Sequence, residues 1–172
     1  MHFSSETKLW ELEATFPAMK GQFISGGDFF TGSNAEKTLA QLHCEQPTWA
    51  LEDMLYGLEN LRRVSDSKVR LVWPLPYASL VYLPAAKKQH TAFAVLAAGG
   101  AYGAVCTMVE AMPVAARLNA LGFDCFCLNY RTAVPESFAS GLMPQPLDDL
   151  ADALHLIAEN RAVFDVDPMQ YL

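Results

Sequence analysis

The chain has 172 residues, a length that fits one domain with a sizeable core. Hydrophobic residues make up 52% of the chain and charged residues only 18%, which argues against disorder over most of its length. The 12 basic and 19 acidic residues give a net charge of −7, and because the basic residues are dispersed, no nucleic-acid partner is expected.

Cysteine usage and the lack of targeting segments predict a cytoplasmic protein. Cys44, Cys106, Cys125 and Cys127 show neither CxxC spacing nor a cysteine/histidine pattern, so we expect free thiols and no metal site. Cys125 and Cys127 alternate with Phe126, which places both on one face of a strand. The chain starts without a basic segment followed by an apolar run and has no apolar run of about 18 residues, so neither a signal peptide nor a membrane span is expected.

Residues 1–66 are expected to form a helical N-terminal extension without strands. Short helical segments, the second from about Asn34 to His43, lie on either side of a glycine-rich break. The longest helix is expected to start with Thr48 as its N-cap and to end at Arg62-Arg63, an arrangement that matches the helix dipole.

The pattern of an α/β domain covers residues 67–172. Two short strands, Val69–Trp73 and Ser79–Leu83, are bounded by prolines and are expected to pair antiparallel. A continuously apolar strand, Ala92–Ala97, follows and runs directly into a glycine-rich turn.

A helix, a strand and a second helix follow that turn. They are expected at about Met108–Leu121, at 123–130 and at about Leu147–Asn160. After a further turn, another parallel strand is expected to begin at Tyr171-Leu172.

The glycine-rich turn Ala98–Gly103 allows two interpretations, because both dinucleotide-binding proteins and hydrolases place exposed backbone N–H groups there. In the first, the turn approximates GxGxxG and Arg131 could meet a 2′-phosphate. In the second, the turn is an oxyanion loop that stabilises the charge of a tetrahedral intermediate. Pro113 favours the second, because proline is tolerated only near the start of a helix, which requires a longer loop before it.

Five stretches of the second half carry a family resemblance. They are Leu96–Tyr102, Glu110–Phe123, Asn129–Arg131, Pro146–Leu154 and Asp165–Pro168. In this order they resemble the PGGGY-type loop, the helix, the YR-type strand end and the helix with Asp-Pro turn of the acetyl-esterase and feruloyl-esterase-like branch of the α/β-hydrolases. The resemblance implies a three-layer α/β-hydrolase-type sheet. It also implies an oxyanion loop formed by Gly99, Gly100, Ala101 and Tyr102.

The catalytic residues of such a hydrolase cannot be placed in this sequence. The family needs a serine on a GxSxG turn, then an acid and a histidine. Ser25 and Ser140 precede glycines without fitting GxSxG, and His43, His90 and His155 lie on expected helices or a turn. The sequence therefore predicts an incomplete esterase or lipase, inactive alone, that acts on a small-molecule ester only if completed and needs no cofactor. A non-catalytic binding domain and a Rossmann-like nucleotide-binding domain are the alternatives.

The predicted sheet is incomplete on its C-terminal side. The strand Cys125–Asn129 and the helix 147–160 are therefore expected to lack a packing neighbour. Self-association, or a partner chain that completes the sheet, is expected to cover this surface.

Overall fold

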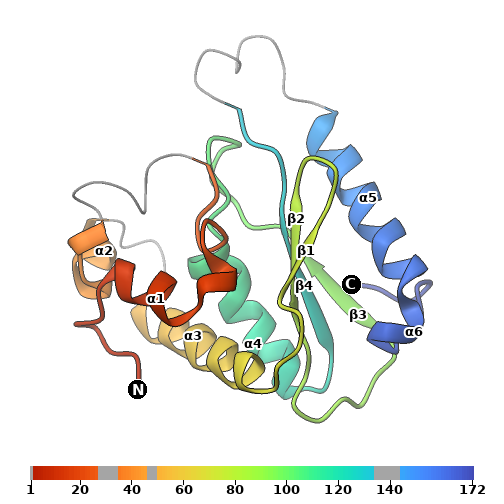
Figure 1. The fold of residues 1–172 in the computed structure, drawn as a ribbon, viewed down its shortest axis with the longest axis horizontal. Helices are drawn as coiled ribbons and strands as arrows, with labels where there is room; N and C mark the ends of the chain where they lie inside the picture. The colour runs from red at the N-terminus through yellow and green to blue at the C-terminus, as the bar shows by residue number, and fades with distance from the viewer. Residues whose placement is uncertain (1, 27–34, 46–49, 134–143) are drawn as a thin grey trace.

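The computed structural model describes residues 2–26, 35–45, 50–133 and 144–172. They form a three-layer α/β fold, with a mixed sheet between two layers of helices (Figure 1). The N-terminal part contains α1 (Leu9–Thr15), the 3₁₀ turn η1 (Pro17–Met19), α2 (Leu39–Glu45) and α3 (Leu51–Asp66). The strands are β1 (Val72–Pro74), β2 (Ser79–Leu83), β3 (Phe93–Leu96) and β4 (Asp124–Asn129). The remaining helical elements are the π-helical turn η3 (Thr107–Ala111), α4 (Met112–Ala120), α5 (Gln145–Glu159) and α6 (Arg161–Phe164).

Strand β4 occupies an inner position in the sheet. The strand order is β1-β2-β4-β3, in which β2 runs antiparallel to both β1 and β4, and β3 runs parallel to β4. All six residues of β4 are buried. The expectation that Cys125–Asn129 lacks a neighbour is therefore wrong, because this strand inserts between β2 and β3.

The outer side of β3 pairs with the last residues of the chain. Tyr171 forms a parallel bridge with Phe93, and Leu172 exchanges backbone hydrogen bonds with Phe93 and Val95. The parallel pairing expected at Tyr171 is thus present as a single bridge, and a strand there stays a prediction.

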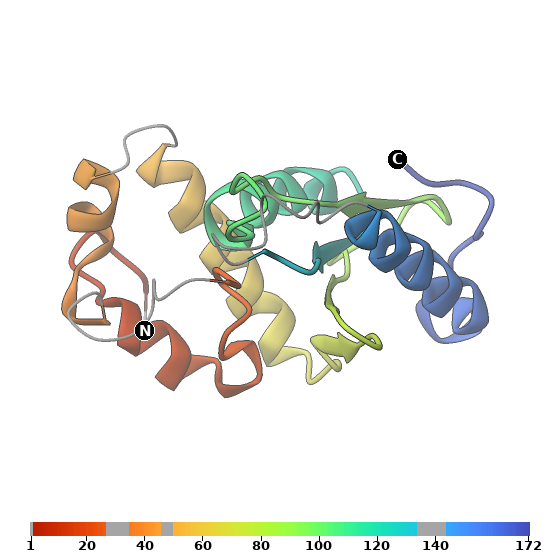
Figure 2. The ribbon, with the colours of Figure 1, turned by 90° about the horizontal axis from the view of Figure 1, so that it is seen from above.

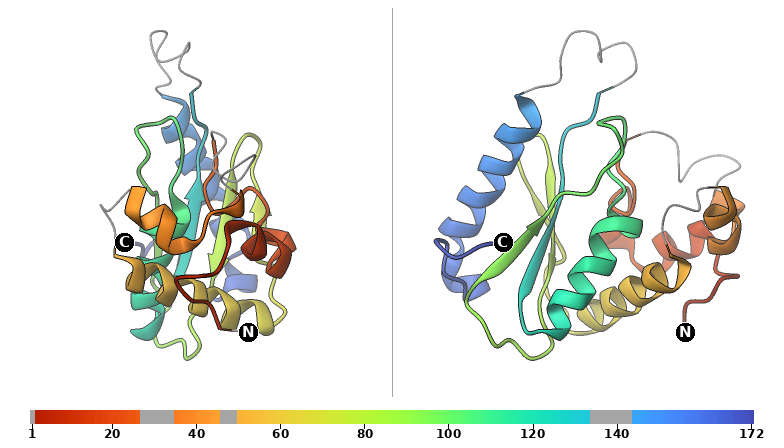
Figure 3. Two further views of the ribbon diagram at one scale, coloured as in Figure 1. Left: turned by 90° about the vertical axis from the view of Figure 1, so that its left-hand side faces the viewer. Right: turned by 180° about the vertical axis from the view of Figure 1, so that it is seen from behind.

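Side chains that alternate along β4 separate two cores. Cys125 and Cys127 lie in the larger core with residues of α3 and α4, whereas Phe126 lies in the smaller core with Ala153 and Ile157 of α5. Figure 3 shows α4 and α5 on opposite sides of the strands. The predicted shared face of the two thiols is confirmed. The expectation that the helix 147–160 lacks a packing neighbour is wrong, because α5 covers this face of the sheet.

The N-terminal helices belong to the larger core. Leu9 and Leu12 of α1 are fully buried in the same cluster as Cys125, and α3 packs on α4. Figure 2 shows these helices on the side of the sheet away from α5. Helix α3 begins with Ala50 as its N-cap, so the prediction of Thr48 in that role is wrong. The domain boundary between residues 66 and 67 stays a prediction.

A long connection joins β3 to α4. The loop after Leu96 leads into η3, and Pro113 lies in the first turn of α4. The helical backbone continues into α4 from η3, and the π-helical turn lies just before the proline that lacks an N–H. The helix expected from Met108 is thus a π-helical turn followed by an α-helix. In the described parts of the chain, no helix has the length and apolar character needed to cross a bilayer.

Candidate oxyanion loop

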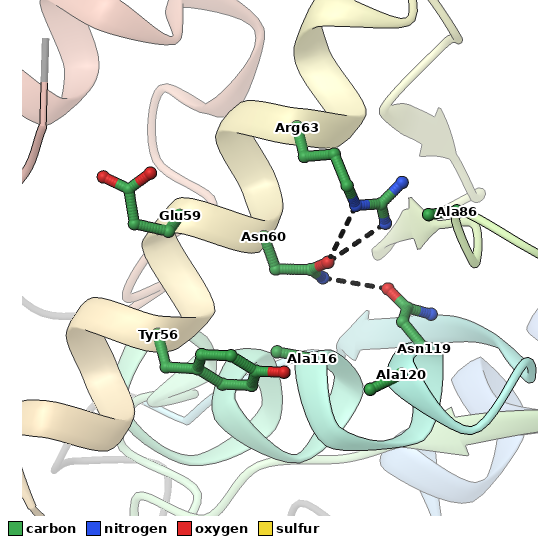
Figure 4. Close-up of a pocket in the computed structure, with 8 residues that line it drawn as sticks. All are labelled: Tyr56, Glu59, Asn60, Arg63, Ala86, Ala116, Asn119 and Ala120. Carbon is green, nitrogen blue, oxygen red and sulfur yellow. Dashed lines mark hydrogen bonds between the residues drawn. The ribbon is translucent and has the colours of Figure 1, made fainter.

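A cavity of about 290 Å³ lies between α3 and α4 (Figure 4). The polar side chains at its rim form hydrogen bonds with one another. The side-chain oxygen Oδ1 of Asn60 accepts hydrogen bonds from the Arg63 guanidinium at 3.0 and 3.2 Å. The side-chain Nδ2 of Asn60 donates to Asn119 Oδ1 at 2.8 Å. Arg63 also donates to the carbonyl of Pro84 at 2.7 Å. Because these donors and acceptors are hydrogen-bonded to one another, we interpret this region as a polar contact between the two helices and not as a ligand site.

A second cavity, of about 380 Å³, opens where β3 and β4 end. Its lining consists of Ala97, Ala98, Gly99, Ala101, Tyr102, Leu128, Tyr130, Pro146, Leu147 and Leu150, without a charged side chain. The Tyr130 hydroxyl donates to the Ala98 carbonyl at 2.8 Å, and the Tyr102 ring meets the Tyr130 ring edge-on at 6.0 Å. The carboxyl ends of parallel strands are where α/β proteins hold their ligands, so this cavity is the candidate site.

The loop beside this cavity has an unusual backbone conformation. Gly100, Ala101 and Tyr102 have φ angles of +138°, +51° and +60°. The N–H groups of Gly103 and Ala104 both donate to the Gly100 carbonyl, at 3.0 and 3.1 Å, which closes the turn. A left-handed conformation costs a non-glycine residue about 1–2 kcal/mol. Ala101 therefore adopts the positive φ that alanine tolerates poorly, and the contacts around the loop must maintain it.

Three consecutive amides of the loop have no acceptor among the described residues. They belong to Gly100, Ala101 and Tyr102. By contrast, the Gly99 amide donates to Glu110 Oε2 at 2.5 Å. Successive N–H groups in such a turn form a concave surface that binds anions. Of the four predicted loop residues, Gly99 therefore has its N–H occupied, and the N–H groups of the other three have no acceptor among the described residues.

No nucleophile and base are paired in the described part of the chain, where no serine or cysteine is hydrogen-bonded to a histidine. His90 stacks on Phe123 at 4.0 Å, and His155 is exposed on α5. Ser140 lies outside the described residues. The described residues also contain no group of three or more His, Cys, Asp or Glu side chains that could hold a metal ion.

The nucleotide-binding interpretation assigns Arg131 to a phosphate group, but its side chain is bound to other residues of the protein. Its Nε donates to Asp149 Oδ1 at 2.8 Å, its Nη2 donates to the Gln145 carbonyl at 3.0 Å, and its guanidinium lies over the Tyr77 ring at 4.8 Å. The hydrogen bond to Asp149 raises the pKa of Arg131 above its ordinary value. The positive charge is thus already balanced, which disfavours a role in binding phosphate.

Sequence reasoning missed the contribution of the segment 22–26 to this site. Ser25 forms an antiparallel bridge with Val105, on the C-terminal side of the loop. The only local signal was the glycine pair at Gly26-Gly27, which we interpreted as a break between helices. Contacts between residues this far apart in the sequence leave no periodic pattern.

Parts of the chain are similar to solved hydrolase structures. An acetyl ester-xyloside bifunctional hydrolase from Caldicellulosiruptor lactoaceticus is 28% identical with a TM-score of 0.42, over 56% of this chain and 33% of that one. MGS-M1, an alpha/beta hydrolase enzyme from a Medee basin deep-sea metagenome library, is 21% identical with a TM-score of 0.41, over 55% of this chain and 39% of that one. A hyperthermophilic esterase from the archaeon Pyrobaculum calidifontis is 18% identical with a TM-score of 0.45, over 77% of this chain and 45% of that one.

Each match spans less than half the length of the solved protein. No protein-family model and no curated protein matches the chain. The three solved proteins are a bifunctional hydrolase, an alpha/beta hydrolase enzyme and an esterase.

Proposed function

We propose that this chain supplies the oxyanion-stabilising part of a carboxylic ester hydrolase. The observation that carries the proposal is the run of amides at Gly100, Ala101 and Tyr102, which lack acceptors among the described residues and lie beside an apolar cavity at the strand ends. Attack on an ester carbonyl places negative charge on its oxygen, and N–H groups already held in position stabilise that charge. The lining without charged side chains suits an uncharged small-molecule ester.

In this proposal the serine nucleophile, its histidine and its acid come from outside the described residues. A complete enzyme of this kind would form an acyl-enzyme by serine attack and release it with water, without a cofactor. We place the protein in the cytoplasm, because none of its four cysteines forms a disulfide. The chain alone should not turn over p-nitrophenyl acetate. Turnover that a serine-directed phosphonate abolishes, with the label on a serine of this chain, would contradict the proposal.

Anion binding tests the loop directly. In a ¹⁵N-labelled sample, addition of methylphosphonate, whose tetrahedral oxygens resemble the reaction intermediate, should shift the amide signals of Gly100, Ala101 and Tyr102. The Gly103 amide serves as an internal control, because it already donates to the Gly100 carbonyl. Sodium chloride at equal ionic strength should not reproduce the shifts. Unchanged signals at all three amides would overturn the proposal.

Glu110 provides a matched electrostatic control. Its carboxylate accepts the Gly99 N–H and lies next to the candidate anion site, where its negative charge opposes anion binding. Glu110→Gln keeps an acceptor for Gly99 and removes the charge, so methylphosphonate should bind about threefold more tightly. The same change at Glu52, an exposed residue of α3, should leave the affinity unchanged.

A further inference from the structure

The N-terminal segment 22–26 packs directly on the candidate loop. In Figure 1 the red segment after η1 lies beside the green loop that follows β3. Ser25 and Val105 exchange two backbone hydrogen bonds, with N–O distances of 3.1 and 2.7 Å, and the Met108 amide donates to the Phe23 carbonyl at 2.7 Å. The segment thus fixes both the end of the loop and the beginning of η3.

Gly26 shows how close this packing is. Its φ is +76°, and a Cβ at this position would lie 2.7 Å from the Gly103 carbonyl oxygen and 2.7 Å from Thr132 Oγ1. Both distances are far shorter than a carbon atom tolerates. The segment therefore contacts the backbone of the loop itself, immediately after the three available amides.

A chain of polar side chains fastens this segment to the sheet. Gln22 Oε1 accepts hydrogen bonds from Ser79 Oγ at 2.6 Å and from Asn129 Nδ2 at 2.8 Å, and the Gln22 carbonyl accepts a second bond from Asn129 at 3.1 Å. Asn129 Oδ1 in turn accepts the hydroxyl of Thr107, the first residue of η3. Asn129 and Thr107 are almost completely buried, so no water competes for these bonds.

We propose that the segment 22–26 is a positioning element of the oxyanion loop, with the Gln22 side chain as its anchor. The proposal rests on the proposed function of the loop. Ala101 and Tyr102 hold left-handed conformations that the chain leaves readily unless its surroundings oppose this. The segment opposes it, because it holds Val105 and Met108 at the point where the loop rejoins regular structure. Gln22 therefore acts on ligand binding through the loop, without contact to the ligand.

The test compares Gln22→Met, which keeps the length of the side chain and removes the acceptor, with Gln89→Met, the same change at an exposed glutamine. Gln22→Met should increase hydrogen exchange at the hydrogen-bonded loop amides of Gly103, Ala104 and Val105 and weaken methylphosphonate binding, each about fivefold, since one hydrogen-bonded anchor is lost. Protection of the β4 amides should remain. Gln89→Met should change neither quantity.

The outcomes separate this proposal from the function on which it rests. Failure of the unmodified chain to bind methylphosphonate through these amides would reject the proposed function. Unmodified binding together with unchanged exchange and affinity in Gln22→Met, or a loss of protection spread equally over β4, would reject the positioning role. If Gln22→Met does not fold, Ser79→Ala removes one donor to Gln22 and should give a smaller change of the same kind.

Discussion

The carboxylate of Asp149 and the guanidinium of Arg131 form an ion pair that joins the end of β4 to α5. The Asp149 side chain is fully buried, its Oδ1 lies 2.7 Å from Arg131 Nη2, and its Oδ2 accepts the backbone N–H of Arg131 at 2.7 Å. Pro146, Leu147 and Leu150 of α5 line the candidate cavity, so this pair holds one wall of the cavity against the sheet.

Loss of the arginine should leave the buried carboxylate with an uncompensated charge. We expect Arg131→Met to lower the free energy of unfolding by clearly more than the loss of an arginine from a surface pair. Arg62→Met is the matched control, because Arg62 pairs with the partly exposed Glu59 and its loss should cost about 1 kcal/mol or less. Urea denaturation measures both values. Equal losses of unfolding free energy in the two variants would show that the buried pair stabilises the protein no more than the surface pair does.

The left-handed turn predicts opposite effects for two exchanges between alanine and glycine. Ala101→Gly should stabilise the protein by about 1 kcal/mol, because glycine adopts a φ of +51° without strain. Gly100→Ala should destabilise it by about 2 kcal/mol or more, since a Cβ there would lie 2.2 Å from the Ala104 carbonyl oxygen. Ala104→Gly, at a residue without a positive φ, should destabilise. Chemical denaturation measures these changes in stability. If Ala101→Gly destabilises the protein as Ala104→Gly does, the left-handed conformation at Ala101 is contradicted.

The four thiols should react at very different rates. Burial raises the pKa of Cys125 to about 12 and raises the pKa of Cys127 as well, so both have almost no thiolate at mildly alkaline pH. Burial and the nearby Glu110 also raise the pKa of Cys106. Cys44 is exposed and should react first with a disulfide reagent, whereas the two β4 thiols should react only after unfolding. Mass spectrometry of the labelled peptides measures the order, and Cys44→Ser should remove the fast phase.

We propose that the surface beside β3 self-associates. Met169, Tyr171 and Leu172 are 85%, 55% and 67% exposed next to the pairing edge of β3. Leu172→Lys should therefore weaken association in sedimentation equilibrium. Leu121→Lys, at an exposed leucine at the end of α4, should not. A monomer at every concentration, or equal effects of the two variants, would contradict this surface assignment.

Local patterns predicted most elements of this fold, although β1 spans Val72–Pro74 rather than Val69–Trp73. Ser79–Leu83 matches β2 at both ends, and the alternation of Cys125, Phe126 and Cys127 places side chains in two different cores as expected. Pro113 also indicated the long loop before α4. These features depend on residues close together in the sequence, where periodicity and proline geometry act directly.

Spatial order and distant contacts could not be predicted in the same way. Periodicity shows that β4 is buried, but not that it lies between β2 and β3, because pairing partners are far apart in the chain. The pairing of Asp149 with Arg131 follows from no local pattern and appears only in three dimensions. The anchor from Gln22 to Asn129 joins residues 107 positions apart, and Gln22 belongs to no motif.

Removal of a single N–H from the loop tests the central claim most directly. Replacement of Ala101 by lactic acid turns its amide into an ester and keeps the methyl group, so the donor disappears while the side chain remains. The same replacement at Ala162, an exposed residue of α6, is the control. We predict that methylphosphonate binding to the Ala101 variant weakens about tenfold, as expected for the loss of one hydrogen bond to a charged group. Unchanged affinity in the folded Ala101 variant would show that these amides do not bind the oxyanion.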